Sequence, residues 1–514
     1  METELKLLIN PEDAENLRNH PLLRQYAISA PREQTLSGIY YDTRNHDLRQ
    51  ADAGLRVRQV DQDWVQTLKA GGTVVAGLHE RNEWESRLAG PEPDLGALRR
   101  QIDPKSGFAK FIKGLHKRGE LIPAFTTSVQ RTVWDLRLPA GDEVECVIDQ
   151  GSIDTDRKKA QVSELELELK SGDPGHLFDL ALQLQNDVPM QIGNLSKADR
   201  GYGLVAAKPS SVFKATPIRL STKMTVEQAF RTIVLSCLEQ IQANQPGLTA
   251  NKDTESLHQM RVGLRRLQSA LAIFKKCMPC PASIQDELHW LNSELGSARD
   301  WDVLLHSTLP NLQTVASIAG IVQPVQDAVQ EKVARIYEDV AAIVASPRYT
   351  KLILTFFSWV QAASWHIGQQ QHECALWSKP IGAFADKVLK RDRRRLLQRG
   401  RWLKQSDAQT RHQVRIAAKR ARYASEFFES IYPKKTVRHY IKSLTELQDQ
   451  LGLLNDASVT NGLLRELEAS RPELRVEAAY ILGYLACRFD QGAPSLLTDW
   501  RDFKAVVPLE IKEI

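Results

Sequence analysis

The first 204 residues contain short segments in which charged and apolar side chains alternate, and the charges are of the types that bind metal ions and phosphate. In SELELELKSG (163–172), Glu164, Glu166 and Glu168 alternate with three leucines. A period of two is typical of a β-strand whose two faces differ. If the leucine face alone is buried, the segment is an ordinary half-solvated strand. If the glutamates point into an enclosed space, cations must offset their mutual repulsion.

Other segments of the same period separate the two signs of charge along the chain. Carboxylates dominate the first and the last segments, whereas arginine and lysine dominate the middle ones. A surface selected for solubility would mix the signs within a strand. Carboxylate oxygens bind Mg²⁺ or Mn²⁺, and guanidinium and ammonium groups bind phosphate oxygens. The pattern therefore favours a lumen that binds a polyanion together with a divalent metal. The acidic side chains outside 163–172 are Glu2, Glu4, Glu83, Glu85, Glu143, Glu145 and Asp149, and the basic ones are Lys6, Arg56, Arg58, Lys69, Arg81, Arg87 and Arg131.

These charges must be positioned by a sheet. Eight segments read as strands, and helical patterns lie at about 93–119 and 174–186. Eight strands with mostly short connections predict an antiparallel sheet closed into a barrel. The strand segments are 2–8, 36–42, 54–60, 63–70, 78–87, 126–138, 142–153 and 161–171.

The second half of the chain is helical and repeats itself. Residues 205–222 are rich in Pro and Ser and predict a linker between a domain at 1–204 and a helical domain at 223–505. LHQMRVGLRRLQSALAIF (257–274) matches RHQVRIAAKRARYASEFF (411–428), and LNSELGSARDWDV (291–303) matches LQDQLGLLNDASV (447–459). The repeat predicts two pseudo-symmetric helical bundles, about 223–375 and 376–505. The fold class is therefore α+β multidomain, a β-barrel followed by an all-α domain.

The two halves differ in charge. Residues 1–204 hold 26 Lys and Arg against 32 Asp and Glu, and the rest of the chain holds 42 against 31. Both copies of the repeat place a histidine and several cations on one helical face. One such helix is most simply a solvated face, but its recurrence favours a cationic groove. Residues 387–404 add nine Lys and Arg against one Asp.

The overall sequence shows no sign of a secreted, membrane-spanning or disulfide-rich protein. The N-terminus METELKLLIN lacks the basic and apolar regions of a signal peptide. No apolar run is long enough for a membrane span. Six cysteines without regular spacing do not form a disulfide framework, and the C-x-x-C at Cys277 and Cys280 has no second pair. The expected location is the cytoplasm, with no membrane partner.

The first ~203 residues resemble a CYTH domain, the triphosphate tunnel metalloenzyme fold. The resemblance lies in E-x-E-x-K at 2–6, IYYDT (39–43), GLRVR (54–58), TLK (67–69), R-x-E-x-E at 81–85, VECVIDQGSI (144–153), SELELEL (163–169) and LSKADRGY (195–202). It implies an eight-stranded tunnel with Glu2, Glu4 and Lys6 as catalytic residues. Glu168 is a weaker candidate, because the family motif is usually anchored on two carboxylates. The metal ligands implied are Glu2, Glu4, Asp149, Glu164 and Glu166, and the phosphate-binding residues are Arg56, Arg58, Lys69, Arg81, Arg131, Lys197 and Arg200.

The resemblance implies a Mg²⁺- or Mn²⁺-dependent triphosphatase. Its relatives include inorganic triphosphatases, thiamine triphosphatases and class IV adenylyl cyclases. No aromatic and polar cluster in the sequence marks a nucleobase or thiazole pocket, and fusion to the second half favours inorganic tripolyphosphate, hydrolysed to diphosphate and orthophosphate. The alternatives are an organic triphosphate hydrolase or cyclase and a non-catalytic polyphosphate-binding protein.

Residues 223–500 resemble a CHAD domain, whose members bind inorganic polyphosphate. The resemblance rests on both H-x-x-R-[VI] helices and both LG-x-x-[RN]-D turns. It implies long-chain polyphosphate as a partner of this half. Nucleic acid is disfavoured, because few aromatic residues are interleaved with the cations. The candidate polyphosphate ligands are His258, Arg261, Arg265, Arg266, His412, Arg415, Lys419, Arg420 and Arg422.

Overall fold

The chain forms two compact units. The structure, a computed structural model, describes residues 1–60, 63–206, 212–314, 319–366, 376–405, 407–490 and 493–510. The first unit comprises Met1–Ser211 together with Ala345–Ala363, and the second comprises Val212–Val344 and Ser364–Ile514. The sequence pattern places 345–363 in the helical domain, whereas the structure groups it with the barrel.

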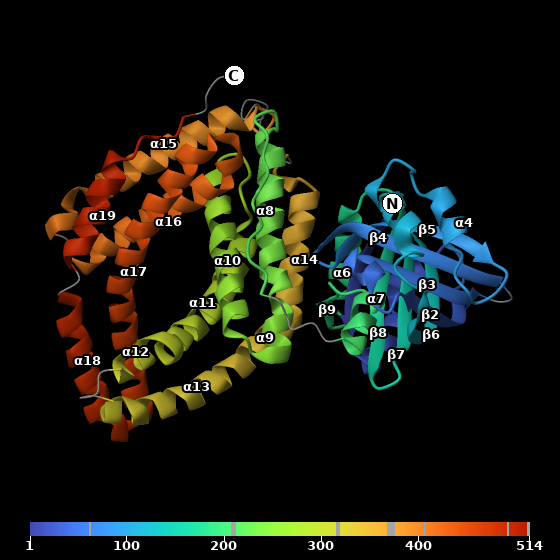
Figure 1. Ribbon diagram of the computed structural model, residues 1–514, viewed down its shortest axis with the longest axis horizontal. Coiled ribbons are helices and arrows are strands. Elements are labelled where there is room, and N and C mark those ends of the chain that lie inside the picture. Colours follow the sequence, from blue (N-terminus) through green and yellow to red (C-terminus); the bar gives the residue numbers. More distant parts are fainter. Residues whose placement is uncertain are drawn as a thin grey trace. The chain divides into compact units, whose positions relative to one another are not determined.

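The first unit is built on a closed, eight-stranded antiparallel β-barrel (Figure 1). The strand order is β5-β4-β3-β2-β6-β7-β8-β1, and β1 closes the barrel by pairing with β5. The edge of β1 that pairs with β5 through Glu2–Leu5 continues with the short β9 through Leu7–Ile9. The predicted barrel is therefore confirmed. The strands are β1 (Glu2–Ile9), β2 (Arg32–Asp42), β3 (Ala53–Val60), β4 (Asp63–Val75), β5 (Leu78–Leu88), β6 (Ile122–Arg137), β7 (Glu143–Asp154), β8 (Lys159–Ser171) and β9 (Met190–Ile192).

The alternation in β8 puts its leucines outside the barrel and its glutamates inside. Leu165 and Leu167 are fully buried, and Glu166 and Glu168 line the interior cavity. Because successive side chains in a strand point to opposite faces, the buried leucines lie on the outer side. The inward orientation of the glutamates is thus confirmed.

Short helices cover the outer face of β2–β5. The segment predicted to be helical at 93–119 forms α4 (Leu95–Gln101) and α5 (Gly107–Leu115). Their apolar residues pack with Leu55, Val57 and Leu68 in one buried cluster. Burial of these apolar side chains is the main favourable term that holds this side of the barrel together. The other short helices around the barrel are α1 (Ala14–Arg18), α2 (Pro21–Tyr26) and α3 (Asp47–Gln50).

Helix α7 (Lys197–Val205) packs against the inner face of the barrel. Its Tyr202 belongs to a buried cluster with Tyr40 and Phe125, and the Tyr202 hydroxyl donates to Asp42 at 2.8 Å. A Cβ at Gly201 would lie 2.2 Å from the Phe125 ring, so only glycine permits this approach. A capping box of Ser196 and Asp199 starts the helix. Its first turn therefore holds Lys197 at the barrel interior.

Helix α14 (Pro347–Gln361) packs against α6 (Gly175–Leu184). The rings of Phe178 and Phe357 stack with centroids 4.5 Å apart, and the Ser358 hydroxyl donates to Asp179 at 2.8 Å. Both phenylalanines are buried. These contacts explain why α14 groups with the barrel although it lies far beyond Ser211 in the chain.

The second unit is helical and repeats one arrangement. In the first repeat α8 packs on α10, and in the second α15 packs on α16. The two repeats meet where the Val226 amide donates to the Lys379 carbonyl and the Ile381 amide donates to the Met224 carbonyl. The predicted pair of similar bundles is therefore present. The helices are α8 (Val226–Ala243), α9 (Gln245–Asn251), α10 (Thr254–Phe274), α11 (Ala282–Val303), α12 (Leu309–Gln313), α13 (Ala319–Ala345), α15 (Ile381–Arg399), α16 (Ala408–Phe427), α17 (Lys434–Ser470), α18 (Arg475–Asp490) and α19 (Ala493–Ala505).

The predicted linker lacks regular secondary structure over most of its described length. Residues 212–221, within the predicted linker, contain neither helix nor strand, and Leu220 is held by hydrogen bonds to Ser430.

Among the described residues no single helix is long and apolar enough to cross a membrane, and α13 and α14 meet that test of length and composition only as a pair.

Candidate functional site

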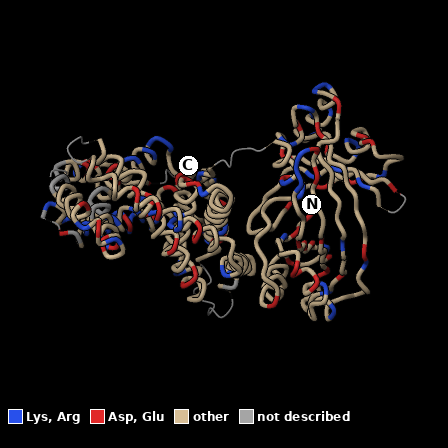
Figure 2. Tube along the Cα trace, turned by 90° about the horizontal axis from the view of Figure 1, so that it is seen from below, with Lys and Arg blue, Asp and Glu red and all other residues tan. Residues whose placement is uncertain are grey.

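The barrel encloses a cavity of about 240 Å³ whose lining is dominated by charge. Figure 2 shows that acidic and basic residues occur along the strands of the barrel, and residues of both signs lie on the neighbouring β4 and β5. The acidic residues that line the cavity are Glu2, Glu4, Glu83, Glu85, Glu145, Glu166 and Glu168. The basic residues are Lys6, Arg56, Arg58, Lys69, Arg81, Arg131, Lys170 and Lys197.

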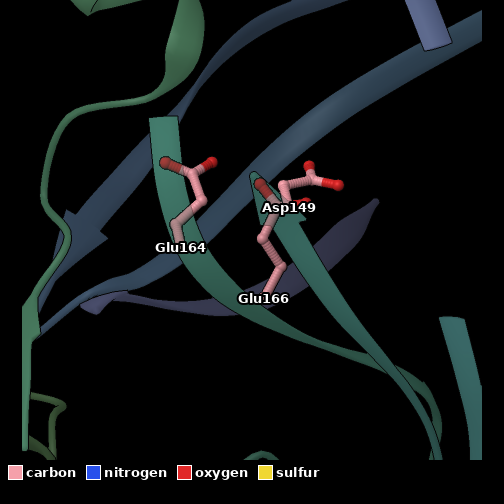
Figure 3. Close-up of side chains that lie close together, drawn as sticks. All are labelled: Asp149, Glu164 and Glu166. Carbon is pink, nitrogen blue, oxygen red and sulfur yellow. The ribbon is translucent and has the colours of Figure 1, made fainter. Parts of the chain in front are cut away.

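Three carboxylates form a cluster at the wall made by β7 and β8. One oxygen from each of Asp149, Glu164 and Glu166 lies within 4.8 Å of the others, and the three side chains converge in Figure 3. Asp149 pairs across the two strands with Glu164. Asp149 and Glu164 are fully buried, whereas Glu166 also lines the cavity. We call these three residues the acidic triad.

Four cations neutralise the acidic triad. Arg131 donates from Nε and Nη2 to the two oxygens of Asp149, at 2.8 and 2.6 Å. The Nζ of Lys197 lies 2.7 Å from Asp149 and 3.0 Å from Glu166 and also bonds Glu164. The other two cations are Lys6, which bonds Glu166, and Arg200, whose Nη1 lies 3.0 Å from Glu164.

These ion pairs set the protonation state of Asp149 and Glu166. Burial alone would raise the pKa of Asp149, but Lys197 and Arg131 outweigh it and lower that pKa. Burial likewise opposes ionisation of Glu166, yet Lys197, Lys6 and Arg131 hold its pKa well below the usual range. Isolated buried carboxylates would instead take up protons. Asp149 and Glu166 are therefore ionised, which is the form that a metal ion or a cation requires.

Glu2 and Glu4 occupy a second part of the cavity, on β1. Both oxygens of Glu2 accept from Lys69 at 2.6 Å, and Glu4 lies 3.6 Å from the Nζ of Lys6. Burial raises the pKa of Glu2 to about 7, against the lowering effect of Lys69. Glu4 pairs across β1 and β8 with Glu168. Both β1 and its neighbour β8 therefore carry carboxylates that face the barrel interior.

The donor set of the triad suits a hard divalent cation. All of its ligand atoms are carboxylate oxygens, the type that Mg²⁺ and Mn²⁺ take. In the part of the chain that the structure describes, these three residues form the one cluster of three or more His, Cys, Asp or Glu side chains with this spacing. The structure therefore brings together Asp149, Glu164 and Glu166 of the five predicted metal ligands, and it places Glu2 and Glu4 on the same cavity outside that cluster.

Six of the seven predicted phosphate-binding residues line the cavity, and Arg200 instead pairs with the buried Glu164. The Nε atoms of Arg56 and Arg58 are buried without a hydrogen-bond partner among the described residues. The Arg56 guanidinium, together with burial, lowers the pKa of Arg58 to about 10. Such neighbouring guanidinium groups repel one another, and a bound anion would relieve that repulsion.

Several residues that line the cavity have no role predicted from the sequence. His79 lies opposite Glu4 across β1 and β5, and one ring nitrogen is 2.8 Å from the Gly193 carbonyl. Burial lowers the pKa of His79 to about 4. Its inward position follows from the alternation of side chains along β5, because His79 and Arg81 are two residues apart and share a face. The other lining residues of this kind are Tyr40, Gly54, Thr67, Glu83, Glu85, Glu145, Val147, Lys170, Ser196 and Ala198.

In the helical unit, the arginine of each H-x-x-R motif lies against a glycine of the next long helix. A Cβ at Gly296 on α11 would lie 3.5 Å from Nη2 of Arg261, and a Cβ at Gly452 on α17 would lie 2.8 Å from Nη1 of Arg415. Arg261 also lies 3.5 Å from Asp300. Gly452 thus makes room for Arg415, whereas a Cβ at Gly296 would make only an ordinary contact with Arg261.

The structure separates the nine predicted polyphosphate ligands into two groups. Arg266 is buried and donates to Gln240 at 2.6 Å, and Arg420 pairs with the buried Asp392. Arg422 donates to Gln448 and Glu426. The remaining six, like Arg420 and Arg422, lie on partly exposed or exposed positions of α10 and α16, and they are His258, Arg261, Arg265, His412, Arg415 and Lys419.

Comparisons with known proteins agree with this division of the chain. An inorganic triphosphatase of Haemophilus influenzae is 34% identical over 201 residues, which are 39% of this chain and 54% of that relative, so the match spans about half of its length. The crystal structure of the CHAD domain from the plant Ricinus communis is 34% identical and covers 59% of this chain and 99% of its own, with a TM-score of 0.54. Residues 1–202 match the family model of the CYTH domain and residues 232–465 that of the CHAD domain. This chain therefore carries an N-terminal CYTH domain followed by a CHAD domain.

Proposed function

We propose that the protein is a divalent-metal-dependent inorganic triphosphatase whose helical domain binds long-chain polyphosphate. The substrate is tripolyphosphate, and the products are diphosphate and orthophosphate. The CYTH match and the similarity to an inorganic triphosphatase support the reaction class. The observation that carries the proposal is the charged cavity inside the barrel, with cations on most of its walls.

The lining of the cavity favours an inorganic substrate. Of the described residues that line the cavity, Tyr40 is the single aromatic one apart from His79, and its ring is already stacked on Phe125. A nucleobase or thiazole would find little apolar surface there.

The basic side chains would bind and orient the triphosphate. Arg56 and Arg58 have guanidinium nitrogens without partners among the described residues and can donate to phosphate oxygens. Lys6 and Lys69, now bonded to carboxylates, can also reach an anion in the cavity. Fixed cations stabilise the charge that accumulates on the departing phosphate as its bond breaks. Positioning and electrostatics therefore supply most of the catalysis.

A divalent ion held by Glu2, Glu4 and the acidic triad, most simply Mg²⁺, would supply Lewis-acid polarisation of the phosphate oxygens. The all-oxygen ligand set supports Mg²⁺ or Mn²⁺ over softer metals. The proposed catalytic roles of Glu2 and Glu4 are metal binding, and that of Lys6 is to hold Glu166 and the substrate in place.

The helical domain would bind polyphosphate through its repeated cationic face. Each repeat contributes one histidine and two cations, from α10 and α16. Arg261 and Arg265 have buried Nε atoms without a partner in the described part of the chain. Burial and the nearby Arg299 lower the pKa of His258, so a bound phosphate would be needed to favour its protonation.

The test is phosphate release from tripolyphosphate by the full chain, with and without Mg²⁺. Glu4→Gln removes one charge from the cavity, and we expect the rate to fall by about a hundredfold or more. Glu12→Gln, an exposed position on the same unit, is the matched control and should keep the wild-type rate. Faster hydrolysis of thiamine triphosphate or ATP than of tripolyphosphate would identify that organic triphosphate as the substrate instead. No metal-dependent release from any triphosphate would contradict the proposed activity.

A further inference from the structure

Helix α15 carries a basic outer face that its partner in the internal repeat lacks. The helices α8 and α15 begin at equivalent points, Val226 and Ile381, where backbone hydrogen bonds and a β-bridge join the segments that precede them. Within its bounds α15 has seven Lys and Arg against two Asp, whereas α8 has one Arg against two Glu. Both helices pack in the same way on the H-x-x-R helix of their repeat. The fold therefore does not require the positive charge of α15.

Five of the cations of α15 form a continuous stripe on its solvent side. At 100° per residue they fall within an arc of about 140°, and the buried positions occupy the opposite side. The buried side includes Ala385, Asp392 and Leu396. Asp392 on that side bonds Arg420 of α16, so the stripe points away from α16. The exposed residues of the stripe are Lys387, Lys390, Arg391, Arg394 and Arg395.

The charge of the stripe is largely uncompensated. The two acidic residues of α15 are used elsewhere, since Asp386 accepts from the Tyr432 hydroxyl at 2.6 Å and Asp392 is buried. Arg391 reaches Asp392 at 3.0 Å. Among the described residues, no carboxylate forms an ion pair with Lys387, Lys390, Arg394 or Arg395. A row of unpaired cations attracts polyanions, with an affinity that falls as salt increases.

A tryptophan lies in the segment that follows α15, seven residues after Arg395 of the stripe. Trp402, in the 3-10 segment η4 (Gly400–Gln405), is 70% exposed, and the adjacent Arg401 and the nearby Lys404 are exposed as well. An indole that is this exposed buries little apolar surface, so packing of the fold does not account for it. Inorganic polyphosphate has no apolar or aromatic surface to cover it, whereas every nucleobase offers a face for stacking. Anionic membranes take up tryptophan, but usually within a broader apolar face.

We propose that the outer face of α15, together with Trp402, binds single-stranded nucleic acid. The cations contact successive backbone phosphates, and the indole stacks on a base at the end of the stripe. The sequence pattern disfavours nucleic acid because aromatics are scarce among the cations, and Trp402 is the exception that the structure exposes. This activity is separate from triphosphate hydrolysis and from the cationic face of α10 and α16.

The first test measures binding of a fluorescent oligouridine to the full chain by anisotropy. The triple variant Lys387→Gln, Arg391→Gln, Arg394→Gln should weaken binding and reduce the slope of log K against log salt by about 0.7 for each phosphate that is no longer neutralised. The matched control, Lys434→Gln, Lys435→Gln, Arg438→Gln, makes the same change in net charge at exposed positions of α17 and should leave binding near the wild-type value. Equal binding by the triple variant and the wild type would overturn the proposal.

The second test separates nucleic acid from other polyanions. Trp402→Leu should weaken oligouridine binding by about fivefold or more and leave binding of long-chain polyphosphate unchanged. Equal losses for both ligands would overturn the role of base stacking, and tighter binding to vesicles of anionic phospholipid than to oligouridine would assign the face to a membrane instead. Thermal unfolding checks that the surface variants are folded, and hydrolysis of tripolyphosphate should be unchanged in all of them.

Discussion

The barrel and the repeated helices hold their cations in opposite ways. In the barrel, Arg131 and Lys197 are mostly buried, and each contacts at least two carboxylates. On α10 and α16 the predicted polyphosphate ligands other than Arg266 are partly exposed or exposed, and Arg261 and Arg415 lie against glycines. Buried charges must be paired, because desolvation otherwise exceeds any gain. Exposed charges carry no such requirement.

This difference matches two kinds of anion. A buried network of paired charges has a fixed size and geometry, so it selects a short anion that can replace existing partners. An exposed row of cations imposes no length, so it suits a long polyanion and gains affinity from each added contact. Under the proposed function, one chain thus combines a site of fixed size for a triphosphate with an open surface for a chain of the same chemical unit.

The largest effect should follow from removing one partner of the buried network. Arg131→Met leaves Asp149, which is fully buried, with Lys197 as its remaining cation, and we expect the free energy of unfolding to fall by about 3–5 kcal/mol. Triphosphate hydrolysis should be lost as well. Urea unfolding followed by circular dichroism measures the change. The control is Arg137→Met, whose exposed pair with Glu143 should contribute less than about 1 kcal/mol. Equal destabilisation by the two variants would remove the contrast between buried and exposed pairs.

A second prediction asks whether α14 belongs energetically to the barrel. Phe357→Ala removes a buried ring that stacks on Phe178 and should lower stability by about 3–4 kcal/mol. Amide hydrogen exchange should speed up in α6 and β9, which contact α14, and much less in α16 and α17. Faster exchange confined to the helical repeats would instead place α14 with the CHAD domain.

The salt dependence of ligand affinity should differ between the barrel and the repeated helices. If about six phosphate contacts form on α10 and α16, polyphosphate affinity should fall by roughly 300-fold between about 50 and 200 mM salt. The Michaelis constant for tripolyphosphate should change much less, because buried charges are screened less than exposed ones. Binding titrations and initial rates in the same buffers make the comparison. Similar salt dependence for both would show that the cavity is as open to solvent as the helices.

The sequence predicts the barrel well, because period two and breaking residues are local signals. The inward direction of Glu166 follows from its alternation with leucines. The same alternation cannot distinguish Glu164, which is covered by Lys197 and Arg200 from α7, from Glu168, which lines the cavity. That distinction depends on where a later helix packs, and it requires the structure.

The helical half shows the same limit. Its repeat reveals two bundles, but Arg266 and Arg420 lie close in sequence to the other predicted ligands and are turned toward Gln240 and Asp392. The position of α14 is also not predictable, since its apolar composition suits either unit. Which neighbour a helix face meets is a tertiary property that a helical period does not contain.

The smallest effect tests the two repeats against each other. At Gly452 a Cβ would lie 2.8 Å from Nη1 of Arg415, so alanine must displace the guanidinium. At Gly296 the nearest atom to a Cβ is Nη2 of Arg261 at 3.5 Å, which is an ordinary contact. Because alanine favours a helix over glycine by up to about 1 kcal/mol, neither Gly452→Ala nor Gly296→Ala should destabilise the protein. Gly452→Ala should weaken polyphosphate binding by about threefold and Gly296→Ala should not. In an Arg415→Ala background the effect of Gly452→Ala should vanish, since the displaced group is gone, and a persisting effect would show that the glycine acts on binding without the arginine.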